Sequence, residues 1–359
     1  MQWFFRAVLI FAIFIFIPAQ ATWAFEPFDC SPYEDVGIYV VERPSGDVLI
    51  SHNHTQPYAP LSITKVLCAI TFLDYYQPDE QIIATPAILS LVQPDSSVAN
   101  LVYGETLTTQ QIIYAMLLPS GNDAARIAAV NSGRRILDNQ NTNARDAMNT
   151  FVEAMNQKAV ALGMVNSNFV NPDGYPTKDM YSTAADINIL CLYAIENYPL
   201  INQAVGDAYI KTVTDKKEHF WVNSNLLMLE TTEYMSWIEG SEPNVYYDPR
   251  VNGIKTGNGD GQRSFAFSAE QDGHILVGSL LHVSQESEQD IFTIAESIIN
   301  WYFTTYQTEV ASEIEQEQAQ DQNGHDGQRR SLHFWLVAFI ISAGTALCTG
   351  VWHWFYYLD

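Results

Sequence analysis

Short runs of apolar residues on either side of a long helical middle section predict β-strands. Residues 36–42 and 48–51 are rich in β-branched and aromatic side chains, and a Pro-Ser-Gly-Asp turn separates the two runs. Strand patterns return at residues 264–270 and 274–281, on either side of a Gln-Asp-Gly sequence that is typical of a hairpin. Strands at both ends of the chain predict one sheet whose two edges come from opposite ends of the sequence.

The middle of the chain, from residue 62 to about residue 198, has the three-to-four-residue apolar spacing of helices. In chain order, helices are predicted after Pro60, from 107–111 into the apolar run 114–118, at 150–162 before Gly163, at 184–197 and at 286–303. These elements together predict an α/β fold, with an antiparallel sheet flanked by helices and an all-helical lobe beside it.

The composition fits a chain with a substantial core. Of the 359 residues, 47% are hydrophobic and only 16% are charged, which permits two domains or one larger one. The net charge of −24 argues against nucleic acid as a partner and fits a solvated exported protein. Cys30, Cys68, Cys191 and Cys348 lack the spacing of metal ligands, so we predict no metal site and no cofactor. Cys68 and Cys191 lie in apolar runs and are expected to be buried.

Residues 1–24 have the pattern of an export signal. Arg6 is the only early positive charge, residues 7–17 are an unbroken apolar run, and the small residues Ala19 and Ala21 suit a cleavage site. Cleavage after Ala21 and cleavage after Ala24 both fit the sequence. Because the apolar run is short for a membrane span, we predict a removed signal peptide rather than a retained anchor.

The C-terminal part of the chain predicts a membrane anchor. Residues 307–330 are rich in acidic residues and glutamine and lack aromatic residues, which is typical of a flexible linker. Residues 331–358 contain no Asp, Glu, Lys or Arg and exceed the roughly 20 residues that cross a bilayer. Trp335 near one end and Trp352 near the other suit the two membrane interfaces. We therefore expect a folded domain at 25–306, held on the outer face of the membrane by a single transmembrane helix; a buried core helix is the alternative.

The candidate chemistry begins at Ser62 and Lys65, which follow Pro60. On a helix, residues three apart share one face, so the two side chains can meet. A serine hydroxyl becomes a good nucleophile when a base takes its proton, and a neutral lysine amine can be that base. The pair predicts a nucleophile and its base only if further motifs follow.

Two further motifs do follow in order, Ser120-Gly121-Asn122 and Lys255-Thr256-Gly257. The order S-x-x-K, S-x-N and K-T-G is characteristic of class A β-lactamases and penicillin-binding proteins. A second S-x-N, at residues 51–53, precedes the nucleophile and is predicted to be a turn at the end of a strand.

The sequence around these motifs resembles the serine D-alanyl-D-alanine carboxypeptidases among the low-molecular-mass penicillin-binding proteins. The resemblance covers about residues 35–300 and is carried by the stretches 116–125, 169–174 with 182–184, 221–227 and 252–257. It implies a β-lactamase/transpeptidase-like fold in a bacterial extracellular enzyme. Such an enzyme removes the terminal D-alanine from peptidoglycan stem pentapeptides and is acylated by β-lactams. The sequence indicates no protein partner.

The resemblance also implies a role for each motif residue. Ser62 is the nucleophile, Lys65 its base, and Ser120 passes a proton to the leaving amine. The substrate is bound by Asn122 at its amide, by Lys255 and Thr256 at its terminal carboxylate, and along the strand beside Gly257. The backbone N–H groups of Ser62 and Asn258 form the oxyanion hole. A buried Lys255 would also lower the pKa of Lys65, since a second cation disfavours protonation.

The chain departs from its relatives directly after the K-T-G motif. Residues 258–264 read Asn-Gly-Asp-Gly-Gln-Arg-Ser instead of the usual hydroxyl-containing pair followed by Ala-Gly. This departure lies at the rim of the site. It is therefore expected to affect which substrate side chain is preferred and how fast the substrate is turned over.

Two other functions were weighed against the carboxypeptidase. A class A-like β-lactamase needs a glutamate that holds the hydrolytic water, and the nearest candidate, Glu153, lies in a predicted helix. A non-catalytic β-lactam sensor would need a cytoplasmic signalling domain, and only Asp359 follows the predicted span. Both are therefore less favoured.

Overall fold

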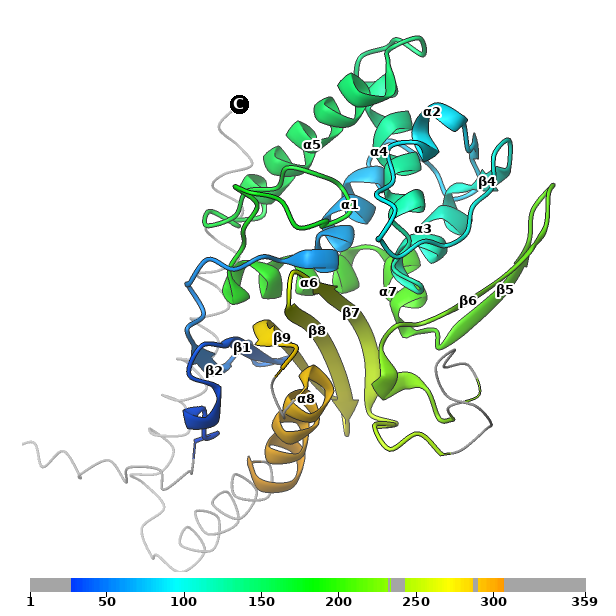
Figure 1. The fold of residues 1–359 in the computed structure, drawn as a ribbon. Helices are drawn as coiled ribbons and strands as arrows, with labels where there is room; N and C mark the ends of the chain where they lie inside the picture. Colours follow the sequence, from blue (N-terminus) through cyan, green and yellow to red (C-terminus); the bar gives the residue numbers. More distant parts are fainter. Residues whose placement is uncertain (1–26, 232, 234–242, 287–289, 307–359) are drawn as a thin grey trace, which may run out of the picture. The chain divides into compact units, whose positions relative to one another are not determined.

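The computed structural model describes residues 27–231, 233, 243–286 and 290–306. Contacts divide the chain into two compact units, Met1–Phe303 and Thr304–Asp359, and the sheet and helices below belong to the first. This unit contains a five-stranded antiparallel sheet, a lobe of helices and two small two-stranded sheets (Figure 1).

The main sheet has the strand order β2-β1-β9-β8-β7. Its strands are β1 (Gly37–Arg43), β2 (Val48–His52), β7 (Val251–Gly259), β8 (Gln262–Gln271) and β9 (His274–Ser284). The edge strands β2 and β7 come from the two opposite parts of the described chain, as predicted, although β7 itself was not among the strands predicted from the pattern. The register pairs Ile38 of β1 with Leu280 of β9, and Lys255 of β7 with Ala266 of β8.

Helices pack on this sheet as predicted. The helix α6 (Ala184–Asn197) packs on β1 and β9, and α7 (Pro199–Gly206) packs on β7. The helix α8 (Ile291–Asn300) packs on β8 and β9, where the ring of Phe292 contacts that of Phe265. Ala266, the next residue, belongs instead to the buried cluster that includes Ile187 of α6. Because successive side chains of a strand point to opposite faces, this alternation buries both faces of β8.

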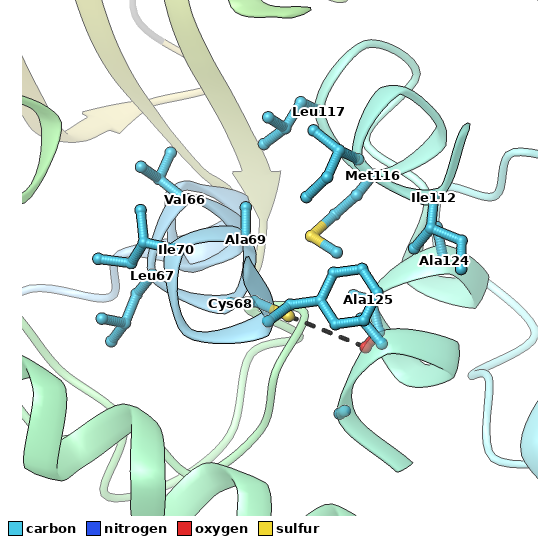
Figure 2. Close-up of a cluster of buried hydrophobic side chains, with 14 of the residues drawn as sticks. Val66, Leu67, Cys68, Ala69, Ile70, Ile112, Met116, Leu117, Ala124 and Ala125 are labelled. Carbon is cyan, nitrogen blue, oxygen red and sulfur yellow. Dashed lines mark hydrogen bonds between the residues drawn. The ribbon is translucent and has the colours of Figure 1, made fainter. Parts of the chain in front are cut away.

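The helical lobe is formed by α1 (Thr64–Leu73), α2 (Pro86–Leu89), α3 (Thr109–Leu117), α4 (Asn122–Ile136) and α5 (Ala144–Ala161). Figure 2 shows Cys68 and Ala69 on the side of α1 that faces α3 and α4, whereas Val66, Leu67 and Ile70 point to the opposite side of the helix. Cys68 is buried there, with its Sγ 3.8 Å from the carbonyl of Ala125. Cys68 and Cys191 are both free and buried, as the sequence predicted. Almost every residue of α1 is buried. Because buried side chains are closely packed, this helix is a rigid support for the side chains near its N-terminal end.

Two small two-stranded sheets were not predicted from the sequence. They pair β3 (Gln81–Ile83) with β4 (Thr106–Thr108), and β5 (Tyr209–Val213) with β6 (Glu218–Val222). Strands of three residues are too short to show an alternating pattern. Trp221 of β6 donates from Nε1 to the carbonyl of Ala99 at 2.9 Å, which ties the second hairpin to the loop before β4.

Capping residues explain where two helices differ from their predicted bounds. The helix α5 begins at Ala144 rather than at residue 150, because the Asn143 side chain accepts from the N–H of Asp146. The helix α8 begins five residues later than predicted, at Ile291 rather than 286. The side chain of Asp290 caps it by accepting from the N–H groups of Phe292 and Thr293. The helix predicted from residue 107 begins two residues later, at Thr109, because Leu107 and Thr108 belong to β4. The helix α6 has its predicted bounds of 184–197.

The predicted signal peptide at 1–24, the linker at 307–330 and the predicted span at 331–358 lie outside the described residues. Within the described ranges, no helix is both long and apolar enough to cross a bilayer.

Candidate active site

Ser62 and Lys65 meet at the start of α1. Ser62 lies in a 3-10 turn, Leu61–Ile63, that leads directly into the helix. The Nζ of Lys65 donates to the Oγ of Ser62 at 2.8 Å. The sequence spacing of three residues therefore gives the contact that was predicted, although the serine stands in the tighter turn before α1 rather than in the α-helix itself.

Lys65 is fully buried, with 0% of its side chain exposed. Its Nζ also donates to the backbone carbonyl of Asp173 at 2.6 Å. Burial lowers the pKa of Lys65 to about 8, because the charged form loses its hydration; the negative charges of Asp173 and Asp123 oppose this shift only in part. A lysine with this pKa is partly neutral near neutral pH, which a general base requires.

The S-x-N motif forms the turn between α3 and α4. Ser120 adopts a left-handed conformation, with φ of 63°, and Asn122 is the first residue of α4. The N–H of Asn122 donates to the carbonyl of Ser97 at 2.9 Å, and Asn122 also lines the cavity that contains Ser62. A Cβ on Gly121 would lie 2.5 Å from the carbonyl of Ala115, so only glycine fits this turn.

The K-T-G motif lies on the edge strand β7. Lys255 is 1% exposed, and its Nζ donates to the carbonyl of Thr256 at 3.0 Å and to the Oγ of Ser224 at 3.5 Å. Burial, and then the positive charge of Lys65, hold the pKa of Lys255 well below its usual range. The charge of Lys65 therefore acts on Lys255, whereas the predicted lowering of the pKa of Lys65 comes first from its own burial.

Ser224 is a site residue that sequence reasoning missed. Its hydroxyl lies 2.6 Å from the hydroxyl of Thr256, and its N–H donates to the carbonyl of Leu118. Ser224 thus joins β7 to the end of α3, two residues before Ser120. The only signal was its place between two asparagines in the stretch 221–227, which carried the family resemblance.

Two glycines allow the nucleophile to be surrounded by backbone. A Cβ on Gly174, whose φ is +79°, would lie 1.9 Å from the carbonyl oxygen of Leu61 and 2.9 Å from the nitrogen of Ser62. A Cβ on Gly257 would lie 3.1 Å from the same nitrogen. The strand β7 therefore passes directly beside the N–H of Ser62, which the expected oxyanion hole needs.

A cavity of about 760 Å³ opens over Ser62. Ser62, Asn122 and Asn258 line it, whereas Lys65, Ser120 and Lys255 are buried and do not line it. The cavity is bounded further by Asp95 and Ser96 before β4, by the loop from Gly174 to Lys178, and by Asp260 and Gln285.

The segment in which the sequence departs from its relatives forms a tight hairpin turn. Asp260 and Gly261 have φ of 53° and 72°, and Gly259 pairs with Gln262. Positive φ at both central residues fits a turn that matches the twist of the strands. The amide of Gln285 donates to that of Asn258. The departure thus extends β7 and β8 to the rim of the cavity without disturbing the K-T-G residues.

Within the described ranges, no group of three or more His, Cys, Asp or Glu side chains is arranged to hold a metal ion. That the enzyme uses no cofactor stays a prediction.

A family model described as D-alanyl-D-alanine carboxypeptidase matches residues 36–281. The D-alanyl-D-alanine carboxypeptidase DacF of Bacillus subtilis is 25% identical over 283 residues, which are 77% of this chain and 64% of that protein. A D-alanyl-D-alanine carboxypeptidase of a Streptomyces species is 26% identical over 68% of this chain and 80% of its own length. A D-alanyl-D-alanine endopeptidase of Pseudomonas aeruginosa is 32% identical over 46% of this chain and 48% of its own length. The crystal structure of the Streptomyces K15 DD-transpeptidase has the same fold, with a TM-score of 0.63, 24% identity and coverage of 74% of this chain and 96% of that one.

Proposed function

We infer from its membership of the D-alanyl-D-alanine carboxypeptidase family, to which this chain belongs, that the protein is a serine enzyme acting on peptides that end in D-Ala-D-Ala. It removes the terminal D-alanine of peptidoglycan stem pentapeptides through an acyl-enzyme on Ser62. The observation that carries this proposal is the contact between Ser62 and Lys65, which is fully buried.

Acylation follows from the positions of these groups. Ser62 Oγ bonds to the carbonyl carbon of the penultimate D-alanine, and its proton passes to the neutral Nζ of Lys65. The oxygen that becomes negative is held by the N–H groups of Ser62 and Asn258, and such donors are worth about 2.7–4 kcal/mol each in other hydrolases. The peptide C–N bond then breaks, and the departing amine takes a proton through the hydroxyl of Ser120.

Binding of the substrate uses the other motif residues. Lys255 and Thr256 attract the terminal carboxylate, with the hydroxyl of Thr256 held by Ser224. Asn122 holds the substrate amide, and Gly257 leaves room for the peptide to lie along β7.

Deacylation distinguishes this reaction from that of a β-lactamase. Water must attack the ester on Ser62, which releases the shortened peptide and restores the hydroxyl. None of the described residues that line the cavity is a glutamate, and Glu153 is exposed on α5. This supports slow hydrolysis of a penicilloyl adduct, and so a carboxypeptidase rather than a β-lactamase.

We also propose that residues 1–24 export the chain and that residues 331–358 anchor it, with the enzyme domain on the outer face of a bacterial membrane. The hydropathy of the two segments supports this. Full-length protein should sediment with membranes, and a chain ending at residue 330 should appear in the medium. If the shortened chain stays with the membrane, the N-terminal segment is the anchor.

The function is tested with full-length protein and a peptide ending in D-Ala-D-Ala. Release of one D-alanine per peptide, measured by mass spectrometry, is expected, together with a stable penicillin adduct on the peptide that contains Ser62. Both should disappear in Ser62→Ala and persist in Ser51→Ala, which changes the exposed serine of the other S-x-N sequence. Rapid hydrolysis of penicillin would show a β-lactamase, and transfer of the acyl group to added glycine without release into water would show a transpeptidase.

A further inference from the structure

A buried ion pair lies directly behind the catalytic lysine. The Nε of Arg126 donates to the Oδ2 of Asp173 at 2.6 Å, and the two side chains are 7% and 0% exposed. Neither residue belongs to the three motifs, and neither lines the cavity. The pair therefore has no direct contact with substrate.

Asp173 connects the ion pair to the catalytic lysine. Its backbone carbonyl accepts from Lys65 Nζ at 2.6 Å, so it is one of the two contacts that orient the amine. Its other carboxylate oxygen accepts from the N–H of Tyr175 at 3.1 Å, and the next residue, Gly174, presses against Leu61 and Ser62. Holding the Asp173 side chain thus fixes the loop that holds Lys65.

Arg126 lies on α4, one turn after Asn122, so both residues are on the same face of that helix. The helix α4, which carries Asn122, therefore also holds the loop at Asp173 through Arg126, and this loop contacts the base Lys65. We propose that Arg126 is a positioning residue: by pairing with Asp173 it keeps the Asp173 carbonyl on Lys65 and offsets a buried carboxylate that would otherwise favour the protonated lysine. This inference rests on the proposed function, because it assigns Lys65 the role of base.

The titratable and charged groups around Lys65 set the sign of the effect. Those that face it are Cys68 on its own helix, Asp123 and Arg126 on α4, Asp173 on the loop, and Lys255 on β7. Asp173 and Asp123 raise the pKa of Lys65, and Arg126 lowers it. Loss of Arg126 alone leaves Asp173 uncompensated, whereas loss of the Asp173 charge alone leaves Arg126 uncompensated. The two changes must therefore move the titration of Lys65 in opposite directions.

The experiment measures the rate of Ser62 acylation by a fluorescent penicillin between pH 6 and 10.5 in full-length protein. Arg126→Gln should move the midpoint of the profile to higher pH, and Asp173→Asn should move it to lower pH, each by about 1 unit or more, because an unpaired charge within about 6 Å has effects of that size. The double variant Arg126→Gln/Asp173→Asn, which can keep a neutral hydrogen bond, should return the midpoint to within about half a unit of the unchanged protein. Arg135→Gln is the matched control, since Arg135 pairs with Glu80 at the surface of the same helix, and it should leave the midpoint unchanged.

A merely structural ion pair predicts a different result. In that case the single variants would lower the thermal unfolding temperature and the amount of active protein, with both midpoints unchanged, and the proposal would be wrong. Shifts of the same sign in the two single variants would also overturn it. If Arg126→Gln does not fold, the downward shift in Asp173→Asn and its reversal in the double variant still decide the matter. Absence of acylation in the unchanged protein would instead disprove the proposed function.

Discussion

The floor and the rim of the cavity over Ser62 differ in their exposure to water. The floor is Ser62 together with the two lysines behind the cavity lining, Lys65 and Lys255, which are 0% and 1% exposed. The loop at Gly174 and the strand β7 at Gly257 pack closely against the backbone of Ser62. On the rim, Asp260 and Lys178 are exposed, and the hydroxyl of Tyr175 donates to the carboxylate of Asp95 at 3.1 Å in an exposed position.

Because of this difference in hydration, charges interact strongly on the floor and weakly at the rim. In a poorly hydrated interior, a charge acts strongly on its neighbours and the pKa of a lysine falls by desolvation. At the rim, water and salt screen the same charges, so an individual pair contributes little. We therefore expect chemistry to depend on the floor and discrimination between substrates to depend on the rim.

Lys65→Arg gives the largest expected loss. A guanidinium stays protonated at every accessible pH, so it cannot accept the proton of Ser62. Acylation by penicillin should fall by about 10²–10⁴-fold, the usual contribution of a general base. The measurement is the second-order acylation rate. Lys178→Arg, the same change at the rim, is the control and should alter that rate by less than about threefold. A normal rate in Lys65→Arg would show that another group is the base.

Gly174→Ala tests the close packing of the floor. The added methyl group would overlap the carbonyl of Leu61, and overpacking typically costs about 1–3 kcal/mol in addition to the strain of a positive φ. Gly163→Ala is a matched control, because Gly163 also has a positive φ, of +89°, but nothing lies within 4 Å of its Cβ. Urea unfolding of the two variants should therefore show a greater loss in Gly174→Ala, accompanied by slower acylation. Equal losses would mean that the backbone conformation alone matters.

The contact between Ser62 and Lys65 could be predicted because it is local. Three residues of separation at the start of a helix place the two side chains together in almost any fold. The order of the motifs identified the other site residues through the family resemblance. Runs of apolar residues around turn sequences predicted both hairpins of the main sheet. The rim sequence 258–264 was known to be unusual, but only the structure shows that Asp260 and Gly261 turn the chain tightly.

The contacts that could not be predicted join residues far apart in the chain. The pairing of Arg126 with Asp173 and the contact of Ser224 with Thr256 depend on how α4, the loop and β7 are packed, and no local pattern reveals it. The predicted start of α5 was wrong for a simpler reason. Its first turn has few apolar residues, so periodicity alone places the beginning at residue 150, whereas the cap at Asn143 decides it.

The pH dependence of acylation reports the pKa of Lys65, and so how well water is excluded from this side chain. Lys65 acts as a base only when neutral, so the rate should rise about tenfold per pH unit below its pKa of about 8 and level off above it. Stability should follow the same group: between pH 8 and the ordinary lysine value of about 10.4, the unfolded chain binds more protons, so the free energy of unfolding rises with pH. The measurement is the single-turnover rate with penicillin, corrected for its hydrolysis in buffer. A midpoint near 10 would mean that water reaches Lys65.

Tyr175→Phe gives the smallest expected effect and tests the rim directly. The change removes only the hydrogen bond to Asp95 and keeps the ring against the cavity. Both groups are exposed and can bond to water instead, so kcat should stay the same and KM for a D-Ala-D-Ala peptide should change by less than about threefold. The unfolding temperature should not move. A large fall in kcat at unchanged KM would show that the rim takes part in the chemical step, and the separation between floor and rim would not hold.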